Sequence, residues 1–323
     1  MKVSKLCIIG TGAWANAMHL PVMRKLQHEG LVEYVAVCDL DQTAAMAFGA
    51  QLGIETACSD ADQMLREVDC DGVVLLLPPA GMPQAIRLAV RYGKPFLCEK
   101  PPSTDTSTHC ELIEEVGDLP HLVAYNRRHS PFITKACEWL QGQELVSLTT
   151  HFSRYRRSDK DFTTTAVHAI DTARCLGGDI GEYRVETQRC AGVVNYYVNG
   201  WFVNGARFDI LLTPWTASAE EHYIVRGVER TVFVAFPTPG VFDGDGCVEY
   251  RSDNRVIQRL RAGDFGIAAD DWPRLAGIDA EHRSFLKVLE NGTVAESNLV
   301  TTLQTQEIRA ALRAALSREC AGS

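Results

Sequence analysis

The feature that most constrains the fold is an alternation of short apolar runs with helical stretches over residues 1–125. Such alternation is typical of a parallel β-sheet covered by helices, because parallel strands are joined by crossover connections. The apolar runs predict strands, and the periodic stretches between them predict amphipathic helices. The expected strands are 6–9, 34–38, 72–77, 95–98 and 121–125, and the expected helices are 13–28, 42–52, 83–92 and 106–116.

The pattern changes after residue 125, where runs rich in Val, Tyr, Phe and Thr predict an antiparallel or mixed sheet. The chain has 323 residues, which suits two domains better than one. We therefore expect an α/β, doubly wound domain over 1–125 and an α+β domain with a large open sheet over 126–323. The expected strands are 144–155, 183–198, 201–212, 222–225, 231–236 and 255–260, and the expected helices are 166–176, 280–290 and 300–316.

Charge and composition exclude several classes of protein. The 32 basic and 41 acidic residues give a net charge of −9, which argues against binding to nucleic acid or an anionic membrane. No apolar run approaches the ~20 residues of a membrane helix, and Leu6–Ile9 is too short for a signal-peptide core. The 11 cysteines form no zinc or redox motif, since no two lie within four residues of each other. We expect no metal, and free thiols in a reducing cytoplasm.

A glycine motif lies directly between the first expected strand and its helix. It reads Gly10-Thr11-Gly12-Ala13-Trp14-Ala15, the G-x-G-x-x-A form of the dinucleotide-binding fingerprint. The first glycine allows a tight turn, the second lets a pyrophosphate approach the backbone, and the alanine lets helix and strand pack closely. Amides at the helix N-terminus would then face the phosphates. All six residues are therefore candidate cofactor contacts.

An acidic residue, Asp39, ends the second expected strand, close to where the fingerprint places its ribose ligand. A carboxylate there can accept both hydroxyls of an adenosine ribose and would repel a 2′-phosphate. We therefore expect NAD as the cofactor, with NADP disfavoured. The alternative is that Asp39 caps the following helix, a role for which Asp41 is better placed.

A strand ending in Glu99-Lys100-Pro101 closes the expected parallel sheet, within the segment Phe96–Pro102. This segment, well downstream of a glycine loop, resembles the glucose-fructose oxidoreductase/inositol dehydrogenase (Gfo/Idh/MocA) family. The resemblance implies a Rossmann domain, a second domain with an open sheet, and hydride transfer between nicotinamide and a carbohydrate, polyol or sugar-acid carbon. It also implies a homodimer or homotetramer. Weaker matches are His19-Leu20-Pro21, Asn126–Pro131, Val167–Asp171, Glu281–Leu286 and Glu290-Asn291-Gly292.

Two residues are candidates for the chemistry of alcohol oxidation. Lys100 lies at the C-terminal edge of a parallel strand, where open α/β sheets bind ligands, and its cation can stabilise a developing alkoxide. His168 matches the family's catalytic histidine, and an imidazole can transfer protons near neutrality. The resemblance further implies cofactor contacts at Pro78, Glu99 and Lys100.

The expected substrate contacts are Asn126, Arg127, Arg154, Arg156, Thr164 and Asp171. Alternation in a strand would point Arg154 and Arg156 to one side, where they would suit an anionic substrate. We favour the alternative, a solvated edge strand and loop that balance nearby acidic residues. Asp171 could orient His168, or pair with Arg174 on the helix surface.

The chain also departs from the family pattern. Thr164 stands where the family commonly has a carboxylate one turn before the histidine, and Leu77–Met82 replaces a usual Thr-Pro-x-x-x-His segment. These departures leave the sugar specificity open. Two alternatives to a dehydrogenase remain: an NAD-binding regulator without turnover, and an enzyme that recycles tightly held NAD, such as a glycosidase or a sugar-sugar oxidoreductase.

Overall fold

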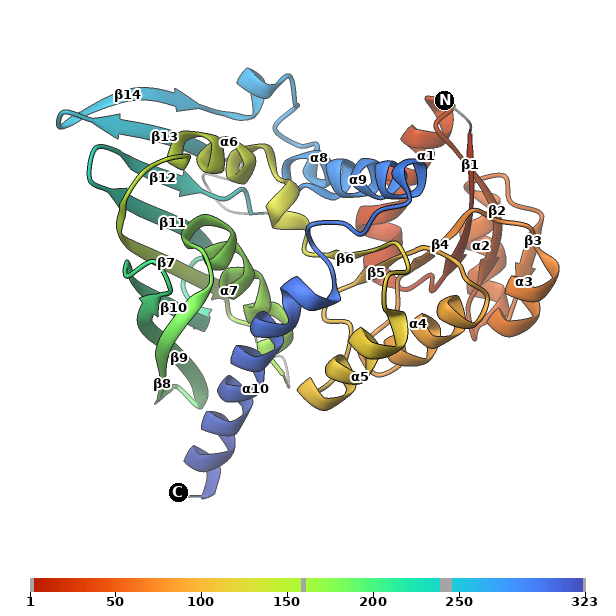
Figure 1. Cartoon of the computed structure of the whole chain (residues 1–323), viewed down its shortest axis with the longest axis horizontal. Coiled ribbons are helices and arrows are strands. Elements are labelled where there is room, and N and C mark those ends of the chain that lie inside the picture. Colours follow the sequence, from red (N-terminus) through yellow and green to blue (C-terminus); the bar gives the residue numbers. More distant parts are fainter. Residues whose placement is uncertain (1–2, 158–160, 239–245, 322–323) are drawn as a thin grey trace. The chain divides into compact units, whose positions relative to one another are not determined.

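The computed structural model describes residues 3–157, 161–238 and 246–321, which form two compact units (Figure 1). The first unit contains residues 1–125 and 278–303, and the second contains 126–277 and 304–323. The division after residue 125 lies where the composition changes. The assignment of all of 126–323 to the second domain needs correction, because Phe285 and Leu289 pack against Gly72 in the first sheet.

The first unit contains a six-stranded, all-parallel sheet in the order β3-β2-β1-β4-β5-β6, which is the doubly wound Rossmann arrangement expected from the sequence. Strands β4, β5 and β6 are buried along their whole length. Strands of this kind read as continuous apolar runs, because helices cover both faces. The strands are β1 (Ser4–Ile9), β2 (Val32–Cys38), β3 (Thr56–Cys58), β4 (Gly72–Leu75), β5 (Phe96–Glu99) and β6 (His121–Ala124).

Helices lie on both faces of this sheet (Figure 1). Helix α4 contacts β4, β5 and α5, whereas α9 contacts β5, β6 and α1. The short β3 and α3 were not expected from the sequence; Asp60 starts α3 by accepting hydrogen bonds from the amides of Asp62 and Gln63. The helices are α1 (Leu20–His28), α2 (Gln42–Ala50), α3 (Ala61–Glu67), α4 (Met82–Arg91), α5 (Thr106–Val116) and α9 (Ile278–Asn291), with a π-helix at Ala15–His19.

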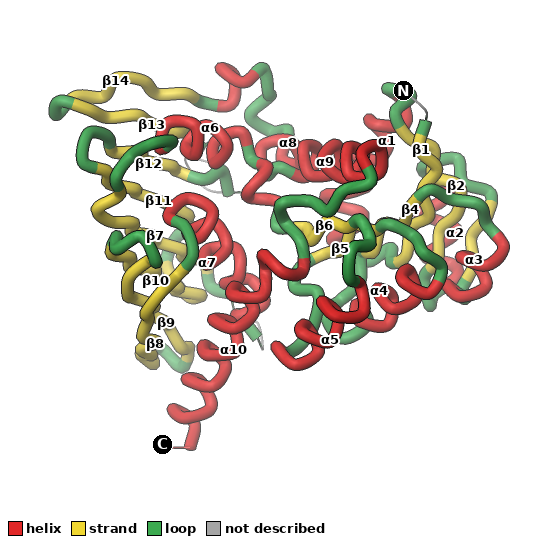
Figure 2. The backbone as a smooth tube through the Cα atoms, in the orientation of Figure 1, coloured by secondary structure: helices red, strands yellow, loops and turns green. Residues whose placement is uncertain are grey.

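The second unit contains an eight-stranded sheet in the order β14-β13-β12-β11-β7-β10-β9-β8 (Figure 2). Strands β7 and β10 pair in parallel and the other neighbours are antiparallel, so the expected mixed open sheet is confirmed. The strands are β7 (Leu145–Tyr155), β8 (Ile180–Cys190), β9 (Val193–Phe202), β10 (Arg207–Thr216), β11 (Glu220–Gly227), β12 (Thr231–Ala235), β13 (Cys247–Ser252) and β14 (Arg255–Leu260).

Two expected strands of this sheet differ from the structure. The run 183–198 is divided between β8 and β9 by a turn at Ala191 and Gly192, both of which have positive φ angles. The run 201–212 likewise contains the turn between β9 and β10. Strand β13 and helix α6 were not expected. The remaining helices are α6 (Pro131–Leu140), α7 (Thr163–Gly177), α8 (Trp272–Leu275) and α10 (Leu299–Ala321), with 3₁₀ turns at Asn126–His129 and Ala262–Phe265.

The two faces of the second sheet differ in burial. Residues on one face alternate into a core with α6 and α7, as Tyr196, Val198 and Phe208 do. The opposite face carries Trp201, which is 48% exposed, and Trp215, which is 42% exposed. A helix layer therefore covers one side of the sheet. Across the described part of the chain, no helix is both long and apolar enough to cross a membrane.

Candidate functional site

The glycine loop lies at the point where the strand order of the first sheet reverses. Strand β1 pairs with both β2 and β4, and Gly10 follows β1 directly. Gly10 has φ +100°, and a Cβ there would lie 2.5 Å from the carbonyl oxygen of Leu76, just beyond β4. Only glycine fits this position without displacing β4. The crevice at this reversal is where doubly wound sheets bind ligands.

The loop leaves its second glycine open. A Cβ built on Gly12 would meet no atom within 4 Å, whereas Ala15 is buried. The side-chain amide of Asn16 donates to the carbonyls of Thr11 at 2.7 Å and Gly12 at 3.1 Å, which holds the loop closed on itself. The exposed backbone at Gly12 fits the approach of a phosphate group.

Asp39, at the end of β2, contacts the same loop. Its Oδ2 accepts hydrogen bonds from the amide of Thr11 at 2.7 Å and from the Thr11 hydroxyl at 2.8 Å. Asp41 is the N-cap of α2, accepting from the amides of Thr43 and Ala44. The alternative reading of Asp39 as the cap is therefore wrong. The Asp39 carboxylate instead binds Thr11 of the glycine loop, and its remaining lone pairs can accept further hydrogen bonds.

Glu99, at the end of β5, joins three parts of the first unit. Its Oε1 accepts from the Trp14 indole at 3.0 Å and from His19 Nε2 at 2.9 Å, and its Oε2 accepts from the amide of Lys100 at 3.1 Å. Burial alone would raise the pKa of this carboxyl, but His19, Lys100 and Trp14 lower it below its ordinary value. The Glu99 carboxylate is thus satisfied by donors from the protein itself. One of these donors, the Trp14 indole, links the glycine loop to the end of β5.

Lys100 and Pro78 follow the C-terminal ends of two neighbouring strands, β5 and β4. Lys100 is partly exposed and its peptide bond to Pro101 is cis. Pro78 is exposed, and its carbonyl accepts from the amides of Gly81 and Met82, where α4 begins. Because all six strands are parallel, these residues lie on the same edge of the sheet as the glycine loop and Asp39.

Helix α9 adds two buried ionisable groups that the sequence analysis did not assign to the site. His282 Nε2 lies 2.9 Å from His19 Nδ1, which extends the Glu99 network. Glu281 is fully buried, and neither of its carboxyl oxygens has a hydrogen-bond partner. Burial and the nearby charge of Glu99 raise the pKa of Glu281 well above its ordinary value, against an opposing effect of Lys100. The surroundings of Glu281 therefore disfavour its charged form.

In the second unit, Glu221 of β11 binds two of the expected substrate residues. Its carboxylate accepts from Arg127 Nε at 2.7 Å, from Arg154 Nη2 at 2.7 Å and from the Tyr223 hydroxyl at 2.8 Å. Burial opposes ionisation, but Arg127 and Arg154 outweigh it and lower the pKa of Glu221 to about 2. Asn126, beside them, is buried and donates to the carbonyl of Ala276 at 2.7 Å. The cluster of Arg127, Arg154 and Glu221 carries one positive charge in excess.

Arg154 and Arg156 do not form the expected pair on one face of a strand. Arg154 is buried, with its guanidinium 3.6 Å from the centre of the Phe152 ring. Strand β7 ends at Tyr155, and Arg156 is exposed with φ 43°, stacked on the Tyr155 ring. The alternation expected of a strand therefore stops before Arg156, and the two guanidinium groups separate.

Asp171 binds Arg128, a partner that the sequence did not suggest. Both of its carboxylate oxygens accept from Arg128, with Nε and Nη2 each at 2.7 Å. Arg174 binds Asp179 and the side chain of Gln304. Asp171 is buried and is thereby tied to the segment that precedes α6.

His168 lies on the same helix, α7, and is 5% exposed. Thr164, one turn earlier, donates its hydroxyl to the carbonyl of Asp161 at 2.9 Å. Asp161, two residues before α7, accepts from the amide of Thr163 and from Arg309 Nη2 at 3.2 Å, so it ties the start of α7 to α10. Among the described residues, no group of three or more His, Cys, Asp or Glu side chains is placed to hold a metal ion.

Comparison with known proteins agrees with this geometry. Residues 4–125 match the family described as "Oxidoreductase family, NAD-binding Rossmann fold" (GFO_IDH_MocA). The chain is 27% identical to D-xylose 1-dehydrogenase (NADP(+)) 2 of Haloferax volcanii over 151 residues, 45% of each chain. It is 25% identical to inositol 2-dehydrogenase of an Arthrobacter species over 186 residues, 54% of each. A dehydrogenase structure from Chromobacterium violaceum matches 100% of this chain and 98% of its own, with a TM-score of 0.86 and 17% identity.

Residues 4–125 thus match the NAD-binding Rossmann domain of the Gfo/Idh/MocA oxidoreductase family. The matched segment spans about half the length of these curated relatives, and the whole-chain structural likeness extends the fold to both units. The resemblance inferred from Glu99-Lys100-Pro101 and the glycine loop is therefore confirmed.

Glu281 gives the fold a dependence on pH whose sign is defined. Its folded pKa is raised, so its contribution to stability is complete below the unfolded value and is lost as pH rises through the folded value. We expect the free energy of unfolding of Glu281→Gln to equal that of the wild type near pH 5 and to be larger near pH 8. The difference should grow by at most about 1.4 kcal/mol per pH unit. Urea unfolding of both proteins across this range measures it.

Glu221→Gln is the matched control, because its pKa is lowered to about 2 and its contribution has the opposite sign. Its contribution is present above the unfolded pKa and disappears as pH falls. Glu221→Gln should therefore be less stable than the wild type at pH 7, with the deficit shrinking toward acid pH. Equal pH dependence of the wild type and Glu281→Gln would show that Glu281 is ionised in the folded protein.

Proposed function

We propose that the protein is an NAD-dependent oxidoreductase that transfers a hydride between nicotinamide and a CH–OH carbon of a carbohydrate, polyol or sugar acid. One observation carries the proposal: the glycine loop, Asp39, Pro78 and Lys100 follow parallel strands and so lie on one edge of one sheet, around the reversal of strand order. The family match over residues 4–125 supports the same cofactor class.

The first unit offers a suitable place for such a cofactor. The open backbone of Gly12 fits a pyrophosphate, and Asp39 has lone pairs for the adenosine ribose hydroxyls. When bound, the nicotinamide supplies the hydride acceptor or donor of the reaction. The protein residues Glu99, Trp14 and His19 hold the loop in register with β5.

In this proposal the Lys100 ammonium stabilises the alkoxide that develops as the alcohol loses its proton, and His168 takes that proton. A cation that acts on developing charge accelerates the reaction more than it strengthens ground-state binding. The excess positive charge of the Arg127–Arg154–Glu221 cluster favours substrates that carry an acid group. The names of the relatives, a xylose dehydrogenase and an inositol dehydrogenase, support a sugar or polyol.

The test is a screen of aldoses, polyols and sugar acids with NAD and NADP, followed by Lys100→Met on the best substrate. We expect kcat/KM to fall at least a hundredfold, about 2–4 kcal/mol, with nucleotide affinity little changed. Lys94→Met is the control, since Lys94 precedes β5 at the other edge of the sheet and donates to the carbonyl of Cys70. Retention of more than about a tenth of the rate by Lys100→Met would remove Lys100 from the chemistry.

The same screen separates the alternatives. NAD binding without turnover of any substrate supports a regulator, and turnover without net release of NADH supports an enzyme that recycles its cofactor. His168→Ala should also lower kcat/KM strongly, by nearly as much as Lys100→Met does. A rate retained in His168→Ala would leave His168 as a packed residue of α7.

Asp39 should set the preference for NAD over NADP. We expect NAD to bind at least tenfold more tightly, about 1.4 kcal/mol, because Asp39 would repel the added phosphate. Asp39→Asn should reduce this ratio, whereas Thr11→Val removes one hydrogen bond to Asp39 and should keep it. Titration of each protein with both nucleotides measures the ratio. Equal affinities in the wild type would refute the role of Asp39.

We also propose that the protein forms a homodimer or homotetramer through the uncovered face of the second sheet. Trp201 and Trp215 are each nearly half exposed on that face, and apolar surface of this kind usually marks an interface. Trp201→Glu should reduce the mass seen by light scattering, whereas Leu40→Glu, at a 95% exposed position of the first unit, should not. A monomeric wild type at micromolar concentration would contradict the proposal.

A further inference from the structure

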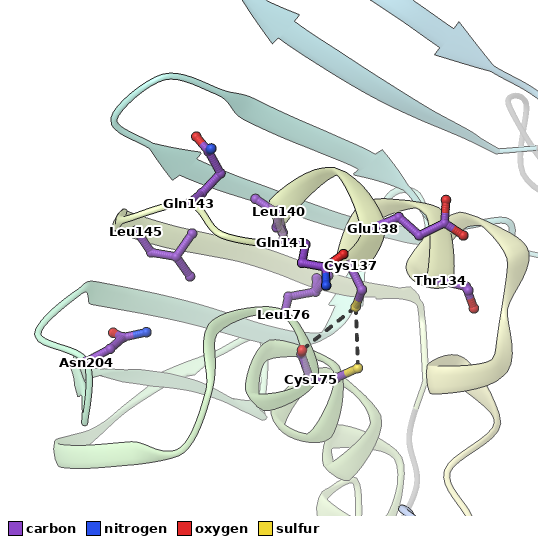
Figure 3. A pocket seen from close by; sticks show the side chains of 10 residues that line it. All are labelled: Thr134, Cys137, Glu138, Leu140, Gln141, Gln143, Leu145, Cys175, Leu176 and Asn204. Carbon is purple, nitrogen blue, oxygen red and sulfur yellow. Dashed lines mark hydrogen bonds between the residues drawn. The ribbon is translucent and has the colours of Figure 1, made fainter.

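Two cysteines from different helices of the second unit face each other. The sulfur of Cys137 on α6 lies 3.8 Å from the sulfur of Cys175 on α7 (Figure 3). Both side chains are partly exposed. They line a cavity of about 470 Å³ between the two helices and the start of β7. The two cysteines are 38 residues apart in sequence, so they do not form a CxxC motif that could be recognised from the sequence.

The cavity is open to solvent. Thr134, Glu138, Gln141 and Asn204 line it, and each of these residues is exposed. Figure 3 shows these polar side chains around the two sulfur atoms. A small polar molecule can therefore reach the pair without unfolding α6 or α7. The other lining residues include Leu140 and Leu176, which keep the inner side of the cavity apolar.

We propose that Cys137 and Cys175 form a dithiol site that reacts with small-molecule disulfides and closes to an intramolecular disulfide. One protein thiolate attacks a sulfur of the small disulfide, forming a mixed disulfide and releasing one small thiol. The second protein thiolate then attacks the protein sulfur of the mixed disulfide and releases the second small thiol. Two protein thiols lose two electrons and two protons, and the small disulfide gains them.

The two sulfur atoms share one environment. The contact with Cys137 and burial together raise the pKa of the Cys175 thiol well above its ordinary value. Cys137 Sγ also lies 3.9 Å from the carbonyl oxygen of Cys175. Whichever sulfur forms the mixed disulfide, the other lies 3.8 Å away and can resolve it.

The cross-link would join two helices that are already tied at another point. Arg128, just before α6, binds Asp171 of α7. Asp171 and Cys175 are one helical turn apart, and His168 precedes Asp171 by three residues, so the three share a face of α7. Oxidation would add a covalent link between α6 and the helix that carries His168. The disulfide form should therefore unfold at a higher urea concentration than the dithiol form.

The experiment uses the full chain with Cys110→Ser and Cys190→Ser, because these two cysteines are exposed and would form mixed disulfides of their own. The protein is incubated with oxidised glutathione, alkylated, digested and mapped by mass spectrometry. We expect a pair of peptides linked by a disulfide between Cys137 and Cys175. Dithiothreitol should reduce this link and separate the two peptides. Cys175→Ser should instead retain glutathione on Cys137, because no resolving thiol remains.

A second probe tests proximity without oxidation. Phenylarsine oxide, a trivalent arsenical, binds pairs of close thiols. In the protein with Cys110→Ser and Cys190→Ser it should protect both Cys137 and Cys175 from alkylation. When Cys175→Ser is added, it should no longer protect Cys137. Protection together with the cross-link supports the proposal. A dithiol that stays reduced at glutathione-disulfide concentrations that modify Cys110 and Cys190 in the wild type would overturn it. So would stable double glutathionylation without a cross-link.

Discussion

The buried carboxylate of Glu99 holds the first unit together at the sheet edge that carries the glycine loop. Three donors converge on it: an indole from the glycine loop, an imidazole from the π-helix, and the backbone of Lys100. A buried charge is tolerated only when such donors replace water, so each partner is needed by the others. The same charge also raises the pKa of Glu281. The position of the glycine loop relative to β5 thus depends on one ionised group.

The second unit uses the same principle twice in the short segment that opens it. Arg127 and Arg128 lie on a 3₁₀ turn, where neighbouring side chains diverge by about a third of a turn. Arg127 reaches Glu221 on β11, and Arg128 reaches Asp171 on α7. Two adjacent cations therefore fasten the turn to the sheet and to the helix that carries His168. Removing either carboxylate would leave a largely buried guanidinium without its counter-charge, which is strongly destabilising.

Much of the fold could be predicted from the sequence, because local patterns decide it. Continuous apolar runs identified five of the six parallel strands, and β3 escaped because it has only 3 residues. The glycine loop was predictable since its turn, its open backbone and its buried alanine each require a particular residue. Lys100 was predictable as the residue that ends a parallel strand.

The partners of the charged residues could not be predicted, because they are distant in sequence. Arg127 and Glu221 are 94 residues apart, and His19 and His282 are 263 apart. A single backbone angle at Arg156 also overturned the expected alternation of Arg154 and Arg156. Trp14 was assigned to the cofactor loop, but nothing local indicated that its indole would bind Glu99. Periodicity describes which face of an element is buried, and it does not identify the group that lies opposite.

The Trp14 indole has a consequence for spectroscopy. It is 46% exposed, yet its nitrogen is fixed to a buried carboxylate. The ring is therefore a rigid fluorophore with one edge in the protein and one in water, placed in the glycine loop itself. A nucleotide that covers the loop would remove water from the exposed edge and shift the emission to shorter wavelength. The nucleotide binding that we propose would then be visible in the emission of Trp14.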